Sequence, residues 1–150
     1  MIMTPYSPEE KEDLFFRFAE NQALMAKCPR KHVGCVIVLS KEMILTAGFN
    51  RSAFGLPTCE DVGCLIEGGH CVRSMHAEQM AIAWAAKRGI RLDGTEAYLT
   101  LLPCVNCFQS LYMSGIKVIH FDESYEREER EHVHQLARSA GVALIERNRS

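Results

Sequence analysis

The 150-residue sequence predicts an α/β fold in which one five-stranded mixed sheet is covered by helices. Two observations support this prediction. Apolar, β-branched runs alternate with stretches of helical periodicity, and the first two apolar runs follow each other across a short polar turn. The expected order of elements is therefore α-β-β-α-β-α-β-α-β. We find no internal repeat or linker, so residues 1–150 are expected to form a single domain.

The N-terminal element is expected to be a helix over residues 8–27. Ser7 suits the N-cap, Pro8 suits the first helical position, and Glu10 stands three residues after Ser7 as in a capping box. Apolar side chains then recur at helical spacing, which favours a helix that packs one face against a core.

The next two apolar runs, 33–39 and 43–49, are read as a β-hairpin around the polar turn 40–42. Segment 50–73 is different, because it is glycine-rich, has no clear period and is long for a loop in a compact domain. Such a loop usually serves a function or is held by a ligand. The remaining elements are expected as helices at 75–88, 104–114 and 126–140 and as strands at 95–101, 116–121 and 142–146.

Composition argues against several classes of partner. The formal net charge of −2 is unlike that of a general polyanion binder, so nucleic acid is not expected as a partner. No apolar run approaches the roughly 18 residues of a membrane span, and no basic segment precedes an apolar one at the N-terminus. We therefore expect a cytoplasmic protein without membrane contact. In a reducing compartment, the seven cysteines are more often metal ligands or buried thiols than disulfides.

Two short motifs carry the chemistry: His76-Ala77-Glu78 and Pro103-Cys104-Val105-Asn106-Cys107. A single C-x-x-C could equally belong to a redox site or to half of a structural zinc site, and a single H-x-E carries little information. Here both occur in order, each at the start of a predicted helix. Together they form the H-x-E…P-C-x-x-C signature of zinc-dependent deaminases.

The residue types suit a catalytic zinc. Zinc binds nitrogen and thiolate ligands in a tetrahedron, and a catalytic zinc keeps one position for water. His76, Cys104 and Cys107 would fill three positions, and the positive end of a helix dipole favours thiolate at the two cysteines. Zinc lowers the pKa of its bound water towards 7. Glu78, close to the metal but not bound to it, could then move protons to the ring nitrogen and to the departing ammonia.

The chain resembles the deoxycytidylate (dCMP) deaminase family over roughly residues 10–145. The matching phrases are Pro29-Arg30-Lys31-His32-Val33-Gly34, Ala47-Gly48-Phe49-Asn50, His70-Cys71-Val72-Arg73-Ser74-Met75-His76-Ala77-Glu78-Gln79, Thr100-Leu101-Leu102-Pro103-Cys104 and Ser114-Gly115-Ile116-Lys117. The resemblance implies a cytidine-deaminase-like three-layer fold, hydrolysis of dCMP to dUMP, and a homohexamer or other homo-oligomer. Many members respond to deoxynucleoside triphosphates, which implies dCTP or dTTP as effectors.

Carried over by position, the resemblance implies that Asn50 contacts the deoxyribose and Arg30 the 5′-phosphate. From the residues alone, Asn50 could simply close the hairpin as a turn residue, and Arg30 could be an exposed residue between a helix and a strand. Three positions depart from the family pattern. Met80 replaces an asparagine, Arg51 a glycine and Phe121 a tyrosine, and the first two put strict dCMP preference in doubt.

Five further residues are candidates for a second, structural zinc, because some relatives bind one with residues of these regions. They are Cys28, Cys59, Cys64, Cys71 and His70, with the four cysteines as the favoured set and His70 replacing one of them. A closed site of this kind would stabilise a glycine-rich loop that buries little surface. The alternative is a set of free thiols in a packed loop. Cys35, inside the first strand, is expected to be a buried apolar residue.

Two other functions compete with dCMP deamination. A zinc deaminase of another base or nucleoside, such as deoxycytidine, guanine or a transfer-RNA adenosine, would share both motifs. A non-catalytic zinc-binding assembly module would share the metal ligands, but it has no need for an unbound carboxylate at Glu78.

Overall fold

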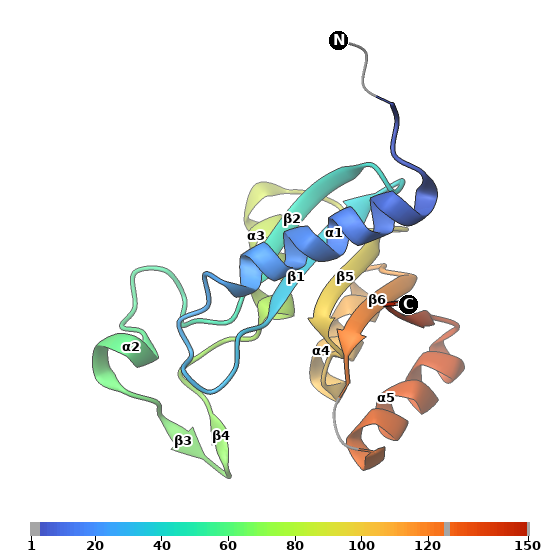
Figure 1. The fold of residues 1–150 in the computed structure, drawn as a ribbon. Coiled ribbons are helices and arrows are strands. Elements are labelled where there is room, and N and C mark those ends of the chain that lie inside the picture. The colour runs from blue at the N-terminus through green and yellow to red at the C-terminus, as the bar shows by residue number, and fades with distance from the viewer. Residues whose placement is uncertain (1–3, 125–126, 150) are drawn as a thin grey trace.

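The computed structural model describes residues 4–124 and 127–149 and has three layers (Figure 1). Helix α1 (Pro8–Ala23) covers one face of the main sheet, and α3 (Ala77–Arg88), α4 (Val105–Met113) and α5 (Arg127–Ala140) lie on the other. The three-layer α/β fold predicted from the sequence is confirmed.

The main sheet is mixed, with strand order β2-β1-β5-β6-β7. Strand β1 pairs antiparallel with both β2 and β5, whereas β5, β6 and β7 are parallel to one another. The strands are β1 (Gly34–Leu39), β2 (Met43–Phe49), β5 (Glu96–Leu101), β6 (Val118–Glu123) and β7 (Ala143–Glu146). The amino end of β1 and the carboxyl ends of β2, β5 and β6 therefore share one edge, and the site lies along it.

Two glycines let the helices approach the β1–β2 hairpin from opposite faces. A Cβ at Gly34 would lie 1.8 Å from the carbonyl oxygen of Ala19 in α1, and a Cβ at Gly48 would lie 2.2 Å from the carbonyl oxygen of Ala77 in α3. The cores on both faces are apolar. Cys35 is fully buried in β1, as expected, and burial raises the pKa of its thiol well above the usual range.

The first helix begins as predicted but ends earlier. Ser7 accepts a hydrogen bond from the Glu10 N–H, and the Glu10 carboxylate accepts one from the Ser7 N–H, so the capping box is confirmed. The predicted end at residue 27 is wrong, because α1 stops at Ala23. Leu24 is exposed, so its side chain adds no buried surface that would favour a longer helix. The Lys27 N–H instead donates to the carbonyl of Asn50, which draws the chain to the end of β2.

Segment 50–73 contains more regular structure than expected. It holds a one-turn helix, α2 (Cys59–Val62), and a two-stranded sheet of β3 (Ile66–Glu67) and β4 (His70–Cys71). Thr58 caps α2, and its backbone N–H and hydroxyl donate to the Asp61 carboxylate. Elements of two to four residues are too short to show a period in the sequence.

The other element boundaries differ from the predictions by one or two residues. The largest difference is the strand expected at 116–121, which runs from Val118 to Glu123, because the Ile116 N–H still donates to Leu111 at the end of α4. The predicted start of the last helix, Glu126, lies outside the described residues. No helix in the described ranges combines the length and apolar composition that a bilayer crossing requires.

Candidate metal centre

His76 is fixed on both sides by backbone hydrogen bonds. It is the N-cap of α3, and its N–H donates to Oε1 of Gln79 at 2.7 Å. The preceding residue, Met75, donates its N–H to the carbonyl of Arg51 at 2.9 Å, which joins the start of α3 to the end of β2. Neither Gln79 nor Arg51 was predicted from the sequence in these roles. The spacing of Gln79, three residues after the N-cap, was the available signal for the first.

The two cysteines of the C-x-x-C motif lie where β5 gives way to α4. Cys104 is the N-cap of α4, and its sulfur accepts a hydrogen bond from the Cys107 N–H at 3.5 Å. Leu102, just before Pro103, donates its N–H to the carbonyl of Glu123 at 2.7 Å. The end of β6 thus holds the backbone that leads into Cys104.

The structure brings His76, Cys104 and Cys107 together, with their donor atoms within 4.8 Å of one another. Nδ1 of His76 lies 3.7 Å from the sulfur of Cys104 and 3.3 Å from that of Cys107. In tetrahedral zinc with usual bond lengths, a nitrogen and a sulfur ligand are about 3.6 Å apart. The donor set and its spacing therefore fit a zinc ion bound through Nδ1.

The protonation preferences of this group also suit a metal. The Cys107 thiol and His76 hydrogen-bond to the Cys104 sulfur and lower the pKa of Cys104 to about 4. The same contact with Cys104, together with burial, raises the pKa of Cys107. The hydrogen bond between His76 and Cys104 raises the pKa of His76. A metal ion bound by the three side chains would take the place of the protons that they hold.

Glu78 lies in the first turn of α3 and is 4% exposed. Its carboxyl is not part of the group whose donor atoms all lie within 4.8 Å. Burial raises the pKa of Glu78 above its usual value, against the opposing effects of its own backbone N–H and of His76. A carboxyl group close to the ligands, enclosed and more easily protonated than usual, has the properties of a general acid–base.

A second cysteine cluster lies in segment 50–73. Cys59, Cys64 and Cys71 have their sulfurs within 4.8 Å of one another, and those of Cys59 and Cys71 are 3.6 Å apart. Two thiolates on tetrahedral zinc are about 3.8 Å apart, so this set also fits the ion. Burial opposes ionisation of Cys71, but backbone N–H groups of Ser74, Leu65 and Arg73 outweigh it and lower its pKa to about 6. Burial and the neighbouring thiols raise the pKa of Cys59 to about 12.

The other two candidates for this cluster lie outside it. Neither Cys28 nor His70 belongs to the described group of three donors. Cys28 is buried, and its neighbour Lys27 forms an ion pair with Glu60 at 3.1 Å, beside Cys59. An ion pair thus joins the residue before Cys28 to α2. His70 is exposed at the tip of the β3–β4 hairpin.

Asn50 uses both ends of its side-chain amide inside the fold. Its Oδ1 accepts the Val33 N–H at 2.8 Å, and its Nδ2 donates to the Lys31 carbonyl at 2.6 Å. Asn50 thereby holds the chain that enters β1. Arg30 is exposed, and both terminal nitrogens of its guanidinium lie 3.3 Å from the Gly69 carbonyl oxygen. Arg30 thus contacts the turn between β3 and β4.

The structure accounts for two departures from the family pattern. The sulfur of Met80 faces β2 and accepts the Phe49 N–H at 3.5 Å, so a thioether takes up the backbone group beside Asn50. The guanidinium of Arg51 lies 4.4 Å from the ring centroid of Phe54 and donates to the Ser52 carbonyl.

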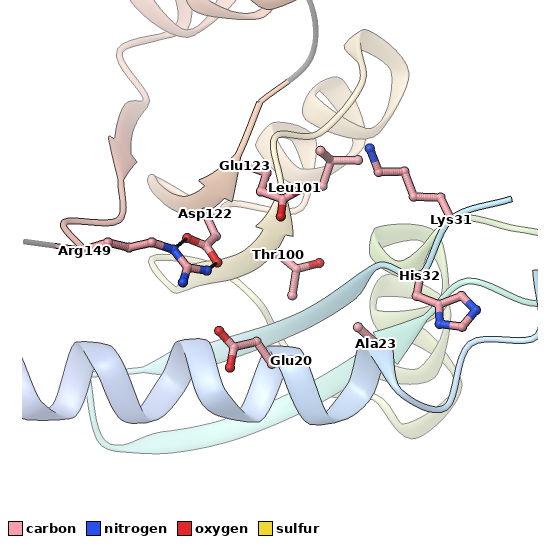
Figure 2. Close-up of a pocket in the computed structure, with 9 residues that line it drawn as sticks. All are labelled: Glu20, Ala23, Lys31, His32, Thr100, Leu101, Asp122, Glu123 and Arg149. Carbon is pink, nitrogen blue, oxygen red and sulfur yellow. Dashed lines mark hydrogen bonds and ion pairs between the residues drawn. The ribbon is translucent and has the colours of Figure 1, made fainter.

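A cavity of about 290 Å³ opens on the α1 side of the same sheet edge (Figure 2). Thr100 and Leu101, at the carboxyl end of β5, form one wall, and Lys31 and His32, next to Arg30, form another. The carboxylates of Glu20 and Asp122 also line it. Asp122 is paired with Arg149, and Figure 2 shows the two side chains next to each other. Open α/β sheets bind their ligands at the carboxyl ends of strands.

Residues 9–123 match the family described as the cytidine and deoxycytidylate deaminase zinc-binding region. The chain belongs to this family. The match contains both cysteine clusters and the H-x-E and C-x-x-C motifs.

The relatives differ in name and in length. ComE operon protein 2 of Bacillus subtilis is 40% identical over 122 residues, which are 81% of this chain and 63% of that protein. The deoxycytidylate deaminase of Saccharomyces cerevisiae is 26% identical over 148 residues, 95% of this chain and 46% of that protein. The chain therefore spans less than two thirds of each of these curated relatives.

A solved structure matches almost the whole chain. It is the dCMP deaminase of cyanophage S-TIM5 in complex with dCMP and dUMP, with a TM-score of 0.79 and 25% identity over 97% of this chain and 100% of that one. Its agreement with the fold described above confirms the cytidine-deaminase-like architecture.

Proposed function

We propose that the protein is a zinc-dependent hydrolase that converts dCMP to dUMP and ammonia. The observation that carries the proposal is the donor set of His76, Cys104 and Cys107 beside the buried carboxyl of Glu78. Three protein ligands leave one tetrahedral position for water, as in catalytic zinc sites. Family membership supports the reaction class, and the relatives named deoxycytidylate deaminase support the substrate.

In this proposal the chain's own residues orient the substrate and move its protons. The zinc, when bound, supplies a water of lowered pKa. Glu78 as carboxylate would take two protons in turn from the attacking water, delivering the first to the ring nitrogen and the second to the amine, which leaves as ammonia. Because the pKa of Glu78 is raised, the free energies of its protonated and ionised forms differ less near neutral pH than for an ordinary glutamate. Enclosure of Glu78 by the fold keeps bulk water from competing for those protons.

The substrate is proposed to bind with its sugar near Asn50 and its phosphate near Arg30. Both residues lie on the edge that carries the metal ligands, and the cavity beside Lys31 and His32 offers space there. A guanidinium can bind phosphate through two parallel hydrogen bonds. For this, Arg30 would exchange its contact with the Gly69 carbonyl for the phosphate.

A second, structural zinc is proposed at Cys59, Cys64 and Cys71. Cys28, whose sulfur lies outside this group of three, would move closer to serve as the fourth ligand. Cys28 is buried and its neighbour Lys27 is paired with Glu60, next to Cys59, which favours Cys28 over exposed His70. A homohexamer, regulation by dCTP or dTTP, and a cytoplasmic location stay predictions from the sequence.

The decisive experiment is ammonia release from a panel of dCMP, CMP, deoxycytidine, dCTP, guanine and adenosine. Release from dCMP well above all others is the expected result. A preference for deoxycytidine would contradict the nucleotide assignment and leave a zinc deaminase of a nucleoside. Absence of release from every substrate by zinc-loaded protein would favour a zinc-binding assembly module.

A further inference from the structure

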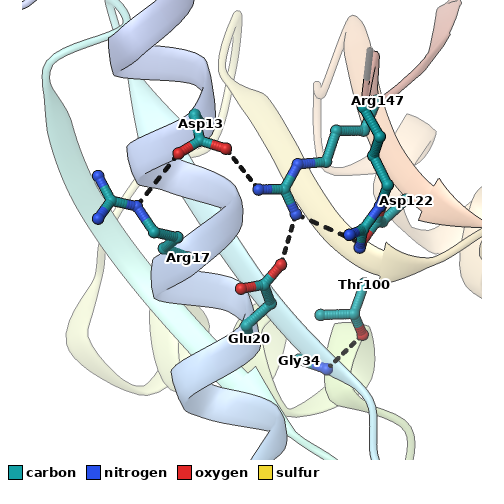
Figure 3. Close-up of polar contacts among 8 residues, drawn as sticks. Asp13, Arg17, Glu20, Gly34, Thr100, Asp122 and Arg147 are labelled. Carbon is teal, nitrogen blue, oxygen red and sulfur yellow. Dashed lines mark hydrogen bonds and ion pairs between the residues drawn. The ribbon is translucent and has the colours of Figure 1, made fainter.

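A network of charged side chains ties the segment after β7 to helix α1 and to the end of β6 (Figure 3). The guanidinium of Arg147 forms ion pairs with Asp13 and Glu20 of α1, and one of its nitrogens lies 3.4 Å from Oδ2 of Asp122. The Arg147 side chain is only 12% exposed and lies over the ring of Phe16, 4.8 Å from its centroid. Arg147 is therefore an enclosed charge with three carboxylate partners.

Asp122 is the carboxylate of this network that most needs its partners. Its side chain is 5% exposed, and Nε of Arg149 donates to it at 2.7 Å in addition to the contact with Arg147. Removal of the partners of a buried charge is strongly destabilising, because the charge is left without compensation away from water. An unpaired Asp122 would move towards solvent and take the end of β6 with it.

The end of β6 is joined by backbone hydrogen bonds to segments on both sides. The Arg147 N–H donates to the Phe121 carbonyl at 2.7 Å, and the Leu102 N–H donates to the Glu123 carbonyl, also at 2.7 Å. Leu102 lies two residues before Cys104. A continuous path of contacts thus runs from the C-terminal arginines through 121–123 to a metal ligand.

We propose that Arg147 and Arg149 are positioning residues for Cys104, acting through Asp122 and the end of β6. The proposal rests on the proposed function in one respect, that His76, Cys104 and Cys107 hold a metal. In the described part of the chain, the polar contacts of both arginines end on α1 and β6, so neither touches the Cys59, Cys64 and Cys71 cluster. The effect is expected at the catalytic zinc alone.

Metal affinity tests this directly. Metal-free protein carrying Cys59→Ser is titrated with cobalt(II), whose thiolate charge-transfer absorption then reports the His76 site. Adding Arg147→Met or Arg149→Ala should weaken cobalt binding about tenfold, the lower end of the 10–100-fold typical when groups that support metal ligands are changed. The control is Arg138→Ala, which removes an ion pair with Glu131 at 3.0 Å on α5 and should leave cobalt affinity unchanged.

A second variant separates positioning from general destabilisation. Asp122→Asn combined with Arg149→Ala leaves no uncompensated carboxylate, so it should bind cobalt more tightly than Arg149→Ala alone. If Arg147→Met does not fold, the test rests on Arg149→Ala. The Arg149 side chain is largely exposed, so this variant is expected to fold. Arginine variants that melt earlier but bind cobalt like the parent would overturn the proposal. Failure of the unaltered protein to deaminate dCMP would instead contradict the proposed function, without changing the cobalt result.

Discussion

At the scale of single residues, the site combines side chains that a local motif specifies with others that only the fold brings near. His76, Cys104, Cys107 and Glu78 could be singled out from the sequence, because each motif fixes its residues on one helix start. Gln79 also has a local signal, its spacing from the N-cap, whereas no local motif indicates the roles of Arg51 and Met80. Arg51 and Met80 act on residues of other segments, since the Arg51 carbonyl accepts the Met75 N–H and the Met80 sulfur accepts the Phe49 N–H.

The role of Glu78 is tested by Glu78→Gln. Glutamine keeps the size of the side chain but cannot exchange a proton, so we expect deamination of dCMP to fall by about 10²–10⁴-fold. Zinc content and thermal unfolding should stay close to those of the parent, because Glu78 is not among the grouped donors. His76→Ala is the contrasting variant and should lose the metal. Turnover of Glu78→Gln near the parent level would remove Glu78 from the mechanism.

The phosphate contact is tested by Arg30→Ala. Hydrogen bonds to charged groups are worth about 1.5–3 kcal/mol each, so loss of such a contact should reduce kcat/KM for dCMP by about 10²–10³-fold. Activity on deoxycytidine should hardly change, because that substrate has no phosphate. The matched control is Arg73→Ala, since Arg73 likewise donates to a loop carbonyl, that of Gly63. Equal losses on both substrates would mean that Arg30 supports the β3–β4 turn instead.

At the scale of elements, periodicity predicted most helices and strands, and tertiary contacts decided where they end. Helix α1 has apolar residues to continue beyond Ala23, yet the hydrogen bond from Lys27 to Asn50 ends it. Periodicity could not predict α2 or the β3–β4 hairpin at all, because each consists of too few residues to show a pattern. Their position depends on the cysteine cluster and on caps such as Thr58.

The contact between β2 and α3 is tested by Gly48→Ala. The added Cβ would lie 2.2 Å from the Ala77 carbonyl oxygen and 2.7 Å from the Ala81 nitrogen, and both are backbone atoms that cannot rotate away. We expect the free energy of unfolding to fall by about 3 kcal/mol or more, the upper range for overpacking. Because α3 carries His76 and Glu78, metal affinity should fall too. Met43→Ala, at an exposed position of the same strand, should stay within about 0.5 kcal/mol.

The ion pair between α1 and the C-terminal segment predicts a specific dependence on pH. The hydrogen bond from Arg147 lowers the pKa of Asp13 below its usual value. The ionised form therefore stabilises the fold above the unfolded pKa of about 3.9, and this contribution is lost as the pH falls through the lower folded pKa. Asp13→Asn should cost no more than about 1 kcal/mol at pH 7, since Asp13 is half exposed.

Urea unfolding of the parent and Asp13→Asn at several pH values gives the measurement. The difference in unfolding free energy between the two should shrink steadily below pH 4. A difference that stays constant down to pH 3 would mean that the charge of Asp13 contributes nothing.

At the scale of the whole molecule, alternation of strands and helices predicted one mixed sheet, but the sequence does not contain its strand order. Strand β5 pairs with β1 across some sixty residues, and this pairing places Thr100 beside Gly34 on the site edge. The network around Arg147 was equally hidden. Charged side chains are usually solvated, whereas this one is enclosed because carboxylates of α1 and of the end of β6 meet around it.

The number of metal ions per chain tests the complete arrangement of the two cysteine clusters. Each fits zinc by donor type and spacing, so elemental analysis of freshly purified protein should give about two zinc ions per chain. Cys59→Ser should remove one ion and lower the melting temperature, because segment 50–73 buries little surface of its own. Cys28→Ser should do the same if Cys28 is the fourth ligand, whereas His70→Ala should keep both ions. Cys35→Ala, in buried β1, is the control that removes a thiol without touching either cluster. If the parent holds a single zinc and Cys59→Ser retains it, the second site is contradicted. Cys59, Cys64 and Cys71 are then free thiols, and segment 50–73 is held without a metal.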